Sequence, residues 1–407
     1  MRILFVSHYA LPHIGGVEVT IDALARELTR RGHDVTHFAA DVEPRPSGEG
    51  DYRVVRLPAA NFPERRMGVP WPIFAPRAAA VLRREVAAAD VVHAHGFLYL
   101  DSFAALMLAR SPRAAPQRPV RVLTEHVGHV PYKSPLLDRT ETAAIATIGR
   151  ISARTAEAVV TYNEGVGEQM ARLAPDGRFE SIPNGVDTER FSPAHEPERG
   201  AIRDELGWDA QPRVLFVARL VPKKGAAAAL AAAAVDADAF KLVVVGPDRL
   251  PFPQPANVES LGPLPAERLA ALYKAADAFL LPSYGEGFPL TVQEAMASGL
   301  PVLLGNDPSY APHIHGAGGG VRLVPAEGPL IAEALRSLLT DPARRAEAGA
   351  MAAAHARRHY SWARAADQHE ALYDDIAQAR TGSASIASGH RNGLVGVEAV
   401  SPHAHST

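Results

Sequence analysis

The chain has 407 residues, of which 47% are hydrophobic, a composition typical of a globular protein with a substantial core. Its formal net charge of −3 gives no reason to expect a nucleic-acid partner, because binding a phosphate backbone needs clustered positive charge. The chain contains no cysteine, which excludes disulfides, thiol catalysis and cysteine metal ligands.

Apolar runs are short throughout the sequence. The run at residues 3–6 is too short for a signal peptide, and none reaches the roughly 18 residues expected of a membrane-spanning helix. The alanine-rich run at 226–235 is interpreted as a helix of a soluble domain. We therefore expect a cytoplasmic protein, with peripheral membrane contact left open and the oligomeric state unassigned.

The first part of the chain alternates apolar strands with amphipathic helices. Residues 3–6 predict a strand, and apolar residues at helical spacing over 17–28 predict a helix. Further strands are expected at 35–39, 52–57, 90–96, 120–124 and 159–161, and further helices at 77–88, 101–109, 150–158 and 164–173. The proline-rich segment 58–76 is expected to be a surface loop. This order predicts an α/β fold with a doubly wound, largely parallel sheet.

A glycine pair, Gly15 and Gly16, lies in the loop between the first strand and the first helix. Glycines at such a position often only ease the reversal of the chain, so the pair alone is weak support for a site. Its functional use would be the close approach of a ligand to the backbone.

Three histidines lie at the ends of expected strands. His93 and His95 alternate along one strand and therefore share a face, while His126 follows the strand at 120–124. No aspartate or glutamate near them supplies the ligand spacing of a zinc site. We interpret His93 and His95 as histidines at a strand end near a polar cleft, and expect no metal.

A second strand–helix series follows a turn-rich connection at 181–191 and a proline- and charge-rich stretch at 192–203. Strands are expected at 213–217, 241–246, 278–282, 301–304 and 320–324, and helices at 226–234, 265–275, 289–299, 329–339, 342–360 and 362–379. We therefore expect an N-terminal domain over 1–192 and a C-terminal domain over 193–360. Residues 382–407, rich in serine, glycine, histidine and alanine without a period, predict a disordered tail.

Two basic residues follow the first strand of the second series. Arg219 and Lys224 at a strand's carboxyl end could clamp a diphosphate, although charges in a loop are usually only solvated.

The stretch 278–301 contains the most informative pattern of the chain. An apolar strand is followed by a loop that carries Glu286, and a helix then begins near Pro289 and ends at Gly299. Glu294 lies about one turn into this helix. The free N–H groups of the first helical turn suit a phosphate, and two nearby carboxylates can accept hydrogen bonds from hydroxyl groups. This combination indicates a phosphorylated polyol or a sugar nucleotide.

Four separated strings resemble one family. They are G-G-V-E at residues 15–18, I-P-N-G-V-D at 182–187, A-R-L-V-P-K-K-G at 218–225 and E-G-F-P-L-T-V-Q-E-A-M-A-S-G-L-P-V at 286–302. Together they resemble the family-4 retaining glycosyltransferases of the GT-B superfamily, over about residues 1–380. The resemblance implies two Rossmann-like domains facing across a cleft, with the donor mainly on the second domain. It also implies a last helix, at 361–381, that crosses back to the first domain.

The implied reaction is hexosyl transfer from a nucleoside-diphosphate sugar to an acceptor hydroxyl with retained anomeric configuration. By resemblance, Arg219 and Lys224 hold the diphosphate, Glu286 binds sugar hydroxyls, Glu294 binds the ribose and His126 contacts the sugar from the first domain. The expected catalytic residues are therefore Arg219, Lys224, Glu286 and His126. The resemblance implies further donor-binding positions in three regions. These are Gly16 in the N-terminal loop, Gly262 and Leu264 where backbone contacts the nucleobase, and Phe288, Pro289 and Leu290 at the start of the 289–299 helix.

No metal or other cofactor is expected. The string Asp236-Ala237-Asp238 matches the metal-binding Asp-x-Asp of a different glycosyltransferase superfamily, but here it ends a helix and precedes a strand. The expected partners are a UDP- or GDP-linked sugar and a small-molecule, glycan or lipid-linked acceptor. Alternatives are a sugar-nucleotide epimerase or phosphorylase on the same fold, and an inactive sugar-nucleotide-binding protein.

Overall fold

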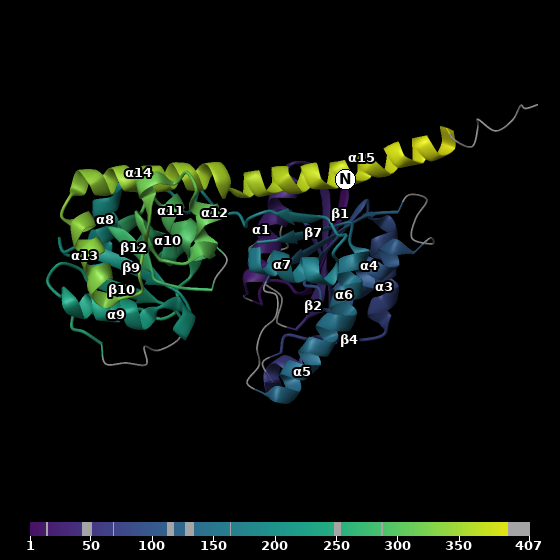
Figure 1. Ribbon diagram of the computed structural model, residues 1–407, viewed down its shortest axis with the longest axis horizontal. Helices are drawn as coiled ribbons and strands as arrows, with labels where there is room; N and C mark the ends of the chain where they lie inside the picture. The colour runs from purple at the N-terminus through teal and green to yellow at the C-terminus, as the bar shows by residue number, and fades with distance from the viewer. Residues whose placement is uncertain are drawn as a thin grey trace, which may run out of the picture.

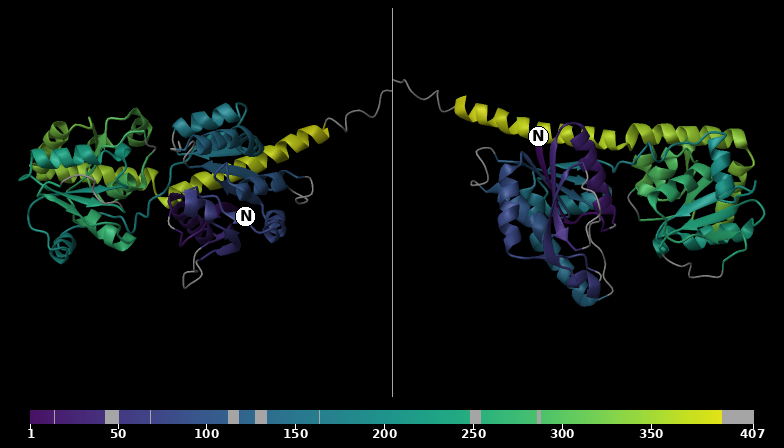
Figure 2. Two further views of the ribbon diagram at one scale, coloured as in Figure 1. Left: turned by 90° about the horizontal axis from the view of Figure 1, so that it is seen from below. Right: turned by 180° about the vertical axis from the view of Figure 1, so that it is seen from behind.

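The computed structural model describes residues 1–389 apart from residues 14, 43–50, 68, 112–117, 127–133, 163, 248–253 and 286–287. The chain forms two α/β domains, each built around its own sheet (Figure 1). The helices α14 (Pro342–His359) and α15 (Trp362–Gly389) run along one side of the molecule, one over each domain, in Figures 1 and 2.

The first domain contains an eight-stranded sheet in the order β4-β3-β2-β1-β5-β6-β7-β8. All neighbouring strands are parallel except β3 and β4, which pair antiparallel. The strands are β1 (Arg2–Tyr9), β2 (Asp34–Asp41), β3 (Arg53–Ala60), β4 (Ile73–Phe74), β5 (Val91–His95), β6 (Val120–Glu125), β7 (Ala158–Thr161) and β8 (Phe179–Ser181). The central strands are buried along their length because helices cover both faces.

The helices of this domain are α1 (Gly16–Arg30), α2 (Phe62–Met67), α3 (Arg77–Ala88), α4 (Leu100–Arg110), α5 (Pro135–Ala144), the π-helical segment η1 (Ile145–Gly149), α6 (Arg150–Thr155) and α7 (Glu164–Leu173). They include the four that the sequence predicts, α1, α3, α4 and α7, a shorter α6, and three helical segments that were not expected, α2, α5 and η1.

The second domain contains a six-stranded, fully parallel sheet in the order β11-β10-β9-β12-β13-β14. Its strands are β9 (Arg213–Val217), β10 (Lys241–Val245), β11 (Val258–Ser260), β12 (Ala278–Leu281), β13 (Val302–Gly305) and β14 (Val321–Val324). Its helical segments, besides α14, are α8 (Glu198–Glu205), η2 (Pro222–Lys224), α9 (Ala226–Val235), α10 (Ala266–Ala275), α11 (Leu290–Ala297), η3 (Pro308–Tyr310), α12 (Ala311–Ile314), η4 (Gly318–Gly320) and α13 (Gly328–Leu339). The α/β fold with two Rossmann-like domains is thus confirmed.

The alanine-rich helix α9 packs against α13 at very short range. A Cβ atom added to Gly328 at the start of α13 would lie 2.7 Å from the Cβ of Ala231. Small side chains on α9 therefore allow the two helix backbones to approach closely, which explains why this helix lacks bulky apolar residues.

The chain crosses between the domains twice, and the two crossings lie side by side. Val186 on the first crossing forms a parallel bridge with Ser361 on the second. A Cβ atom on Gly185 would lie 2.4 Å from the Trp362 ring and 2.8 Å from the Trp362 Cα, so only glycine fits there. After Trp362, α15 packs on the first domain and contributes Ala366, Leu372, Tyr373 and Ile376 to its core.

Three sequence expectations need correction. The segment 58–76 is not only a loop, because it contains α2 and β4. The segment Pro135–Gly149 is helical although no helix was expected there; apart from Gly149 it has no buried residue, so packing does not impose the apolar stripe of a core-facing helix on its sequence. Helix α15 runs ten residues beyond the expected end at 379, since Gly382 weakens a helix but does not stop one. The rest of the expected tail, 390–407, lies outside the described residues.

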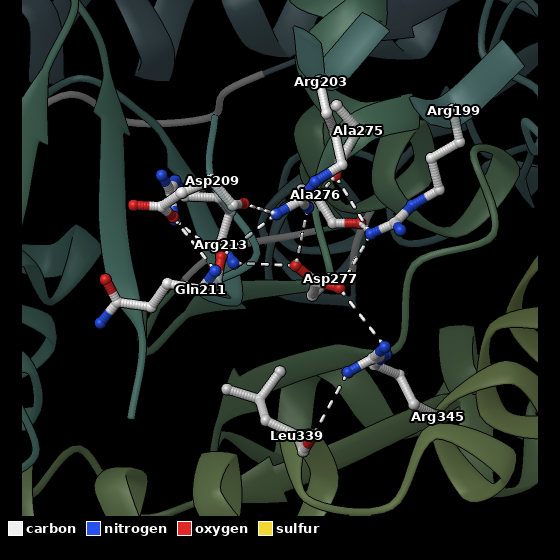
Figure 3. Close-up of polar contacts among 10 residues, drawn as sticks. All are labelled: Arg199, Arg203, Asp209, Gln211, Arg213, Ala275, Ala276, Asp277, Leu339 and Arg345. Atoms are coloured by element: carbon white, nitrogen blue, oxygen red, sulfur yellow. Dashed lines mark hydrogen bonds and ion pairs between the residues drawn. The ribbon is translucent and has the colours of Figure 1, made fainter. Parts of the chain in front are cut away.

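A cluster of arginines holds the amino edge of the second sheet together (Figure 3). Asp277, which is only 5% exposed and precedes β12, pairs with Arg199 and Arg203 of α8 at 2.8 and 3.2 Å and with Arg345 of α14 at 3.5 Å. It also accepts a hydrogen bond of 2.8 Å from the backbone N–H of Arg213. One carboxylate thus links two helices to the start of the two central strands.

Within the described part of the chain, no helix is both long and apolar enough to cross a membrane.

Candidate active site

The two loops that carry the donor-binding strings start at neighbouring strands. Strands β9 and β12 pair directly at the centre of the second sheet, where the strand order reverses. In open parallel sheets, ligands bind outside the carboxyl ends of the strands at this switch point. The loop after β9 carries Arg219 and Lys224, and the loop after β12 leads into α11.

Direct contacts hold these two loops together. The backbone N–H of Tyr284 donates a 3.0 Å hydrogen bond to the carbonyl oxygen of Lys223. Gly225 has a φ angle of +75°, and a Cβ atom there would lie 2.2 Å from the carbonyl oxygen of Pro282. Glycine is therefore required at this position both by the backbone conformation and by the close approach of the second loop.

Arg219 and Lys224 both lie on the first of the joined loops, the one after β9. Arg219 is exposed, and Lys224 is half-buried at the end of the short helix η2. An exposed guanidinium and a half-buried ammonium at one edge of a sheet give two cationic groups that a diphosphate could contact.

The start of α11 faces the same edge. Phe288 directs its ring into the core, where it stacks on His313 with a centroid distance of 5.0 Å, and its carbonyl oxygen accepts a hydrogen bond from Gln293. Only the backbone of Phe288 is therefore available to a ligand. Pro289 caps α11 and Leu290 is its first residue, so the helix presents its unpaired N–H groups beside the two loops.

Glu294 lies near the start of α11 and is held by Tyr273 of α10. The Tyr273 hydroxyl lies 3.1 Å from Glu294 Oε2 and 3.1 Å from the carbonyl oxygen of Thr291. Burial raises the pKa of Glu294 from 4.5 to about 7, against the opposing effects of the Tyr273 hydrogen bond and the Arg190 charge. The carboxyl group is therefore poised to ionise when a ligand supplies hydrogen-bond donors.

The remaining donor-side positions lie on adjacent loops. Gly262 and Leu264 follow β11, and the carbonyl oxygen of Gly262 accepts a 3.2 Å hydrogen bond from the N–H of Gly246 after β10. Glu286 lies outside the described residues. Its neighbour Gly285, after β12, donates a 2.5 Å hydrogen bond from its N–H to Asp307, after β13. The loops after β10, β11, β12 and β13 therefore lie at the same edge of the sheet as the loop after β9.

His126 and Gly16 belong to the corresponding edge of the first sheet. Gly16 begins α1 after β1, and His126 directly follows β6, which is separated from β1 only by β5. His126 Nε2 lies 3.0 Å from Nδ1 of His95, and burial lowers the pKa of His126 to about 3. His126 is therefore a neutral imidazole at the edge of its domain.

His93 and His95 are fully buried rather than open to a polar cleft. His93 contacts the Tyr373 hydroxyl of α15 at 2.7 Å and the Thr124 hydroxyl at 2.6 Å. The last helix was expected to cross back to the first domain, but the sequence did not show that its Tyr373 would cover His93.

Sequence reasoning missed several polar residues at this edge. Glu18 in the first turn of α1 is buried, which raises its pKa, and it lies 3.4 Å from Nε2 of His8. The His8 ring stacks on Tyr99 with a centroid distance of 3.9 Å. The position of His8 at the end of β1, the switch-point strand of its sheet, was the available signal.

Among the described residues, no three histidine, aspartate or glutamate side chains are grouped so as to hold a metal ion. Asp236 caps the end of α9 and pairs with Arg336 of α13 at 2.7 Å. It lies at the amino end of the following strand, β10, on the opposite side of the sheet from Arg219 and Lys224.

The predicted site residues therefore form two groups. Arg219, Lys224, Gly262, Leu264, Phe288, Pro289, Leu290 and Glu294 share the carboxyl edge of the second sheet, and Gly16 and His126 share that of the first.

Two Rossmann-like domains, each with polar residues at the switch point of its sheet, form the architecture of the GT-B fold. The chain matches the family model described as Glycosyltransferase Family 4 over residues 14–190 and that described as Glycosyl transferases group 1 over residues 198–355. It is 30% identical to a D-inositol 3-phosphate glycosyltransferase of Nocardia farcinica, with 87% of this chain and 83% of the relative covered. It is 31% identical to a GDP-mannose-dependent alpha-mannosyltransferase of Mycolicibacterium smegmatis, with 74% and 79% covered.

Among solved structures, Anabaena HepE in complex with UDP-glucose superposes with a TM-score of 0.65 at 19% identity, covering 92% of this chain and all of that one. This likeness shows the fold. The relatives and the family models show that the chain belongs to the family-4 glycosyltransferases and is a hexosyltransferase that uses nucleotide sugars.

Proposed function

We propose that this protein transfers a hexosyl group from a UDP- or GDP-linked sugar to an acceptor hydroxyl, with retention of anomeric configuration and without a metal ion. The observation that carries the proposal is the joining of the post-β9 and post-β12 loops at the switch point. It gathers two cationic side chains and a helix N-terminus where the diphosphate of the donor would lie.

The chemical difficulty of the reaction is the negative charge that develops on the departing diphosphate. Arg219, Lys224 and the start of α11 would stabilise this charge, an electrostatic contribution that is usually the largest in catalysis. Because these groups can stabilise the negative charge that a divalent cation stabilises in other glycosyltransferases, we propose that no metal is required. The engagement of Asp236 by Arg336 supports this interpretation, because it assigns Asp236 a structural partner.

We further propose a division of labour within the donor. Glu294 would accept hydrogen bonds from the ribose, Glu286 would bind the sugar hydroxyls, and backbone at Gly262 and Leu264 would lie against the nucleobase. The Gly16 loop and His126 would approach the donor from the first domain. No enzyme nucleophile is assigned, and the acceptor hydroxyl would attack on the face that the diphosphate leaves.

The names of the two relatives and the ligand of the structural neighbour support a GDP-mannose or UDP-glucose type of donor, and the inositol phosphate relative supports a phosphorylated polyol as acceptor. A cytoplasmic location would fit a nucleotide-sugar substrate.

A two-stage screen tests the proposal. Thermal shift with UDP, GDP and ADP should identify one stabilising nucleoside diphosphate, since a ligand that binds only the folded state raises its melting temperature. The matching hexose donors are then incubated with inositol phosphate, free inositol, simple glycosides and a lipid-linked acceptor. We expect transfer to at least one acceptor; epimerised donor without any transfer would favour an epimerase instead.

A further inference from the structure

A run of three imidazoles crosses from the core of the first domain to its active-site edge. The rings of His93 and His95 stack with a centroid distance of 4.5 Å, and His95 Nδ1 lies 3.0 Å from His126 Nε2. The Phe5 ring of β1 packs on both, with centroid distances of 5.4 Å to His93 and 5.5 Å to His95. Membership of the glycosyltransferase family does not by itself account for the contact between the fully buried His95 ring and the His126 ring at the edge of the domain.

The backbone fixes this contact. Glu125, at the end of β6, accepts hydrogen bonds from the N–H of Phe97 at 2.9 Å and from the N–H of His126 at 3.0 Å. Its carboxylate thereby ties the loop after β5 to the loop after β6. The Ser102 hydroxyl also donates to the carbonyl oxygen of His95 at 2.9 Å. His95 and His126 are thus held at hydrogen-bonding distance by their neighbouring strands.

Only one proton can lie between the two rings. Burial holds the pKa of both imidazoles well below the ordinary value, so both are neutral and each carries a single N–H. Either His95 Nδ1 donates to His126 Nε2, or His126 Nε2 donates to His95 Nδ1.

The second ring nitrogen of His95, Nε2, distinguishes the two arrangements. His95 Nε2 is buried and has no hydrogen-bond partner within the described structure. If His126 were the donor, His95 would have to carry its own N–H on Nε2, which would leave an unpaired N–H in the core. Orphaned buried N–H groups are rarer than unpaired acceptors, so the proton belongs on Nδ1 of His95.

A proton on His95 Nδ1 also determines the protonation of the other ring nitrogen of His126, Nδ1. With Nε2 acting as an acceptor, the proton of the His126 ring is on Nδ1. His126 is only partly buried and directly follows β6, at the carboxyl edge of the sheet where ligands bind, so Nδ1 is the ring nitrogen left for a ligand. We propose that His95 is a positioning residue that holds His126 as its Nδ1–H tautomer, so that His126 donates a hydrogen bond to the bound sugar nucleotide and does not act as a base. The ligand in this statement rests on the proposed function; the tautomer does not.

Two readouts test the inference separately. In protein labelled with 15N-histidine, long-range 1H–15N spectra report the tautomer of each ring, and His126→Phe identifies the His126 signals. We expect the Nδ1–H tautomer for His126 in the wild type and in His95→Asn, because the asparagine amide nitrogen replaces Nδ1 of the imidazole as a donor. His95→Leu removes that donor and should shift His126 toward Nε2–H. His93→Leu removes a neighbouring buried imidazole and should leave the His126 tautomer unchanged.

The kinetic readout follows the tautomer. His95→Leu should lower kcat by about tenfold, the cost of one misplaced hydrogen bond, while the affinity for the nucleoside diphosphate product stays constant. His95→Asn should restore kcat to within about threefold. An Nε2–H tautomer for His126 in the wild type, or an unchanged tautomer and rate in His95→Leu, would overturn the inference. If His95→Leu does not fold, the wild-type spectrum still tests the inference, because an Nε2–H tautomer for His126 would overturn it. Absence of transfer with every donor would instead overturn the proposed function and the ligand assignment, and the spectra would still settle the tautomer.

Discussion

Glu294 should make nucleotide binding depend on pH. Its pKa is raised by burial to about 7, so the carboxyl group is largely protonated at pH 6 in the free protein. Ribose hydroxyls that donate hydrogen bonds favour the ionised form. With this pKa, about one tenth of the groups are ionised at pH 6 and about nine tenths at pH 8, so the affinity for the nucleoside diphosphate should fall about tenfold between pH 8 and pH 6.

Calorimetric titration at pH 6, 7 and 8 measures this effect. Repeating the titration at pH 7 in two buffers of different ionisation enthalpy gives the number of protons released, which should be about one half. The diphosphate also titrates in this range, so Glu294→Gln is the matched control that removes only the protein's contribution. Tyr273→Phe removes the hydrogen bond that lowers the Glu294 pKa and should move the half-affinity pH upward. Identical pH slopes in the wild type and Glu294→Gln would refute the reasoning.

The same carboxyl group should affect stability. Because its folded-state pKa lies above 4.5, its contribution to the free energy of unfolding is fully present below pH 4.5 and is lost as the pH rises through 7. Glu294→Gln should therefore gain melting temperature relative to the wild type at pH 8 and not at pH 4. An equal difference at both pH values would contradict the burial of this group.

Four further perturbations follow from the described contacts. Lys224→Ala should lower kcat/KM for the donor by at least about tenfold, and near-wild-type kinetics in a folded variant would show that this lysine is only a solvated charge. Asp277→Asn should reduce the free energy of unfolding in urea by about 3 kcal/mol, because it leaves three partly buried arginines without their shared carboxylate, whereas Glu205→Gln, at an ion pair with Arg268 whose side chains are 73% and 56% exposed, should cost less than about 1 kcal/mol. Gly185→Ala should destabilise the protein by about 1–3 kcal/mol, measured in the same way, since its methyl group would overlap Trp362. Transfer should survive excess EDTA, and Asp236→Asn should leave the rate unchanged; loss of activity on chelation and recovery with magnesium or manganese would contradict metal independence.

The sequence predicts the parts of the site that follow one another along the chain. The apolar run before Pro282 and the glycine after α11 identify a strand and a helix, and both lie in the structure close to their expected positions. The order of strands then brings Arg219 to the same edge, because β9 and β12 are neighbours at the switch point.

Contacts between distant segments could not be predicted in this way. The arginines around Asp277 come from two helices and a strand, and no local pattern relates Arg199 to Arg345. The contact of His95 with His126 depends on the register of β5 against β6, in which His95 pairs with Thr124. Likewise, Tyr273 meets Glu294 only because α10 and α11 pack together.

Transfer with retention at the switch-point site of the second domain is the central claim. It is tested most directly by following the donor, the acceptor and the product together by 1H NMR in real time, with and without acceptor and in the presence of EDTA. We predict a product anomeric signal with the configuration of the donor sugar, with release of nucleoside diphosphate only when the acceptor is present, and with this signal much reduced in Lys224→Ala. A product of inverted configuration, or conversion of the donor at the same rate without acceptor, would contradict it.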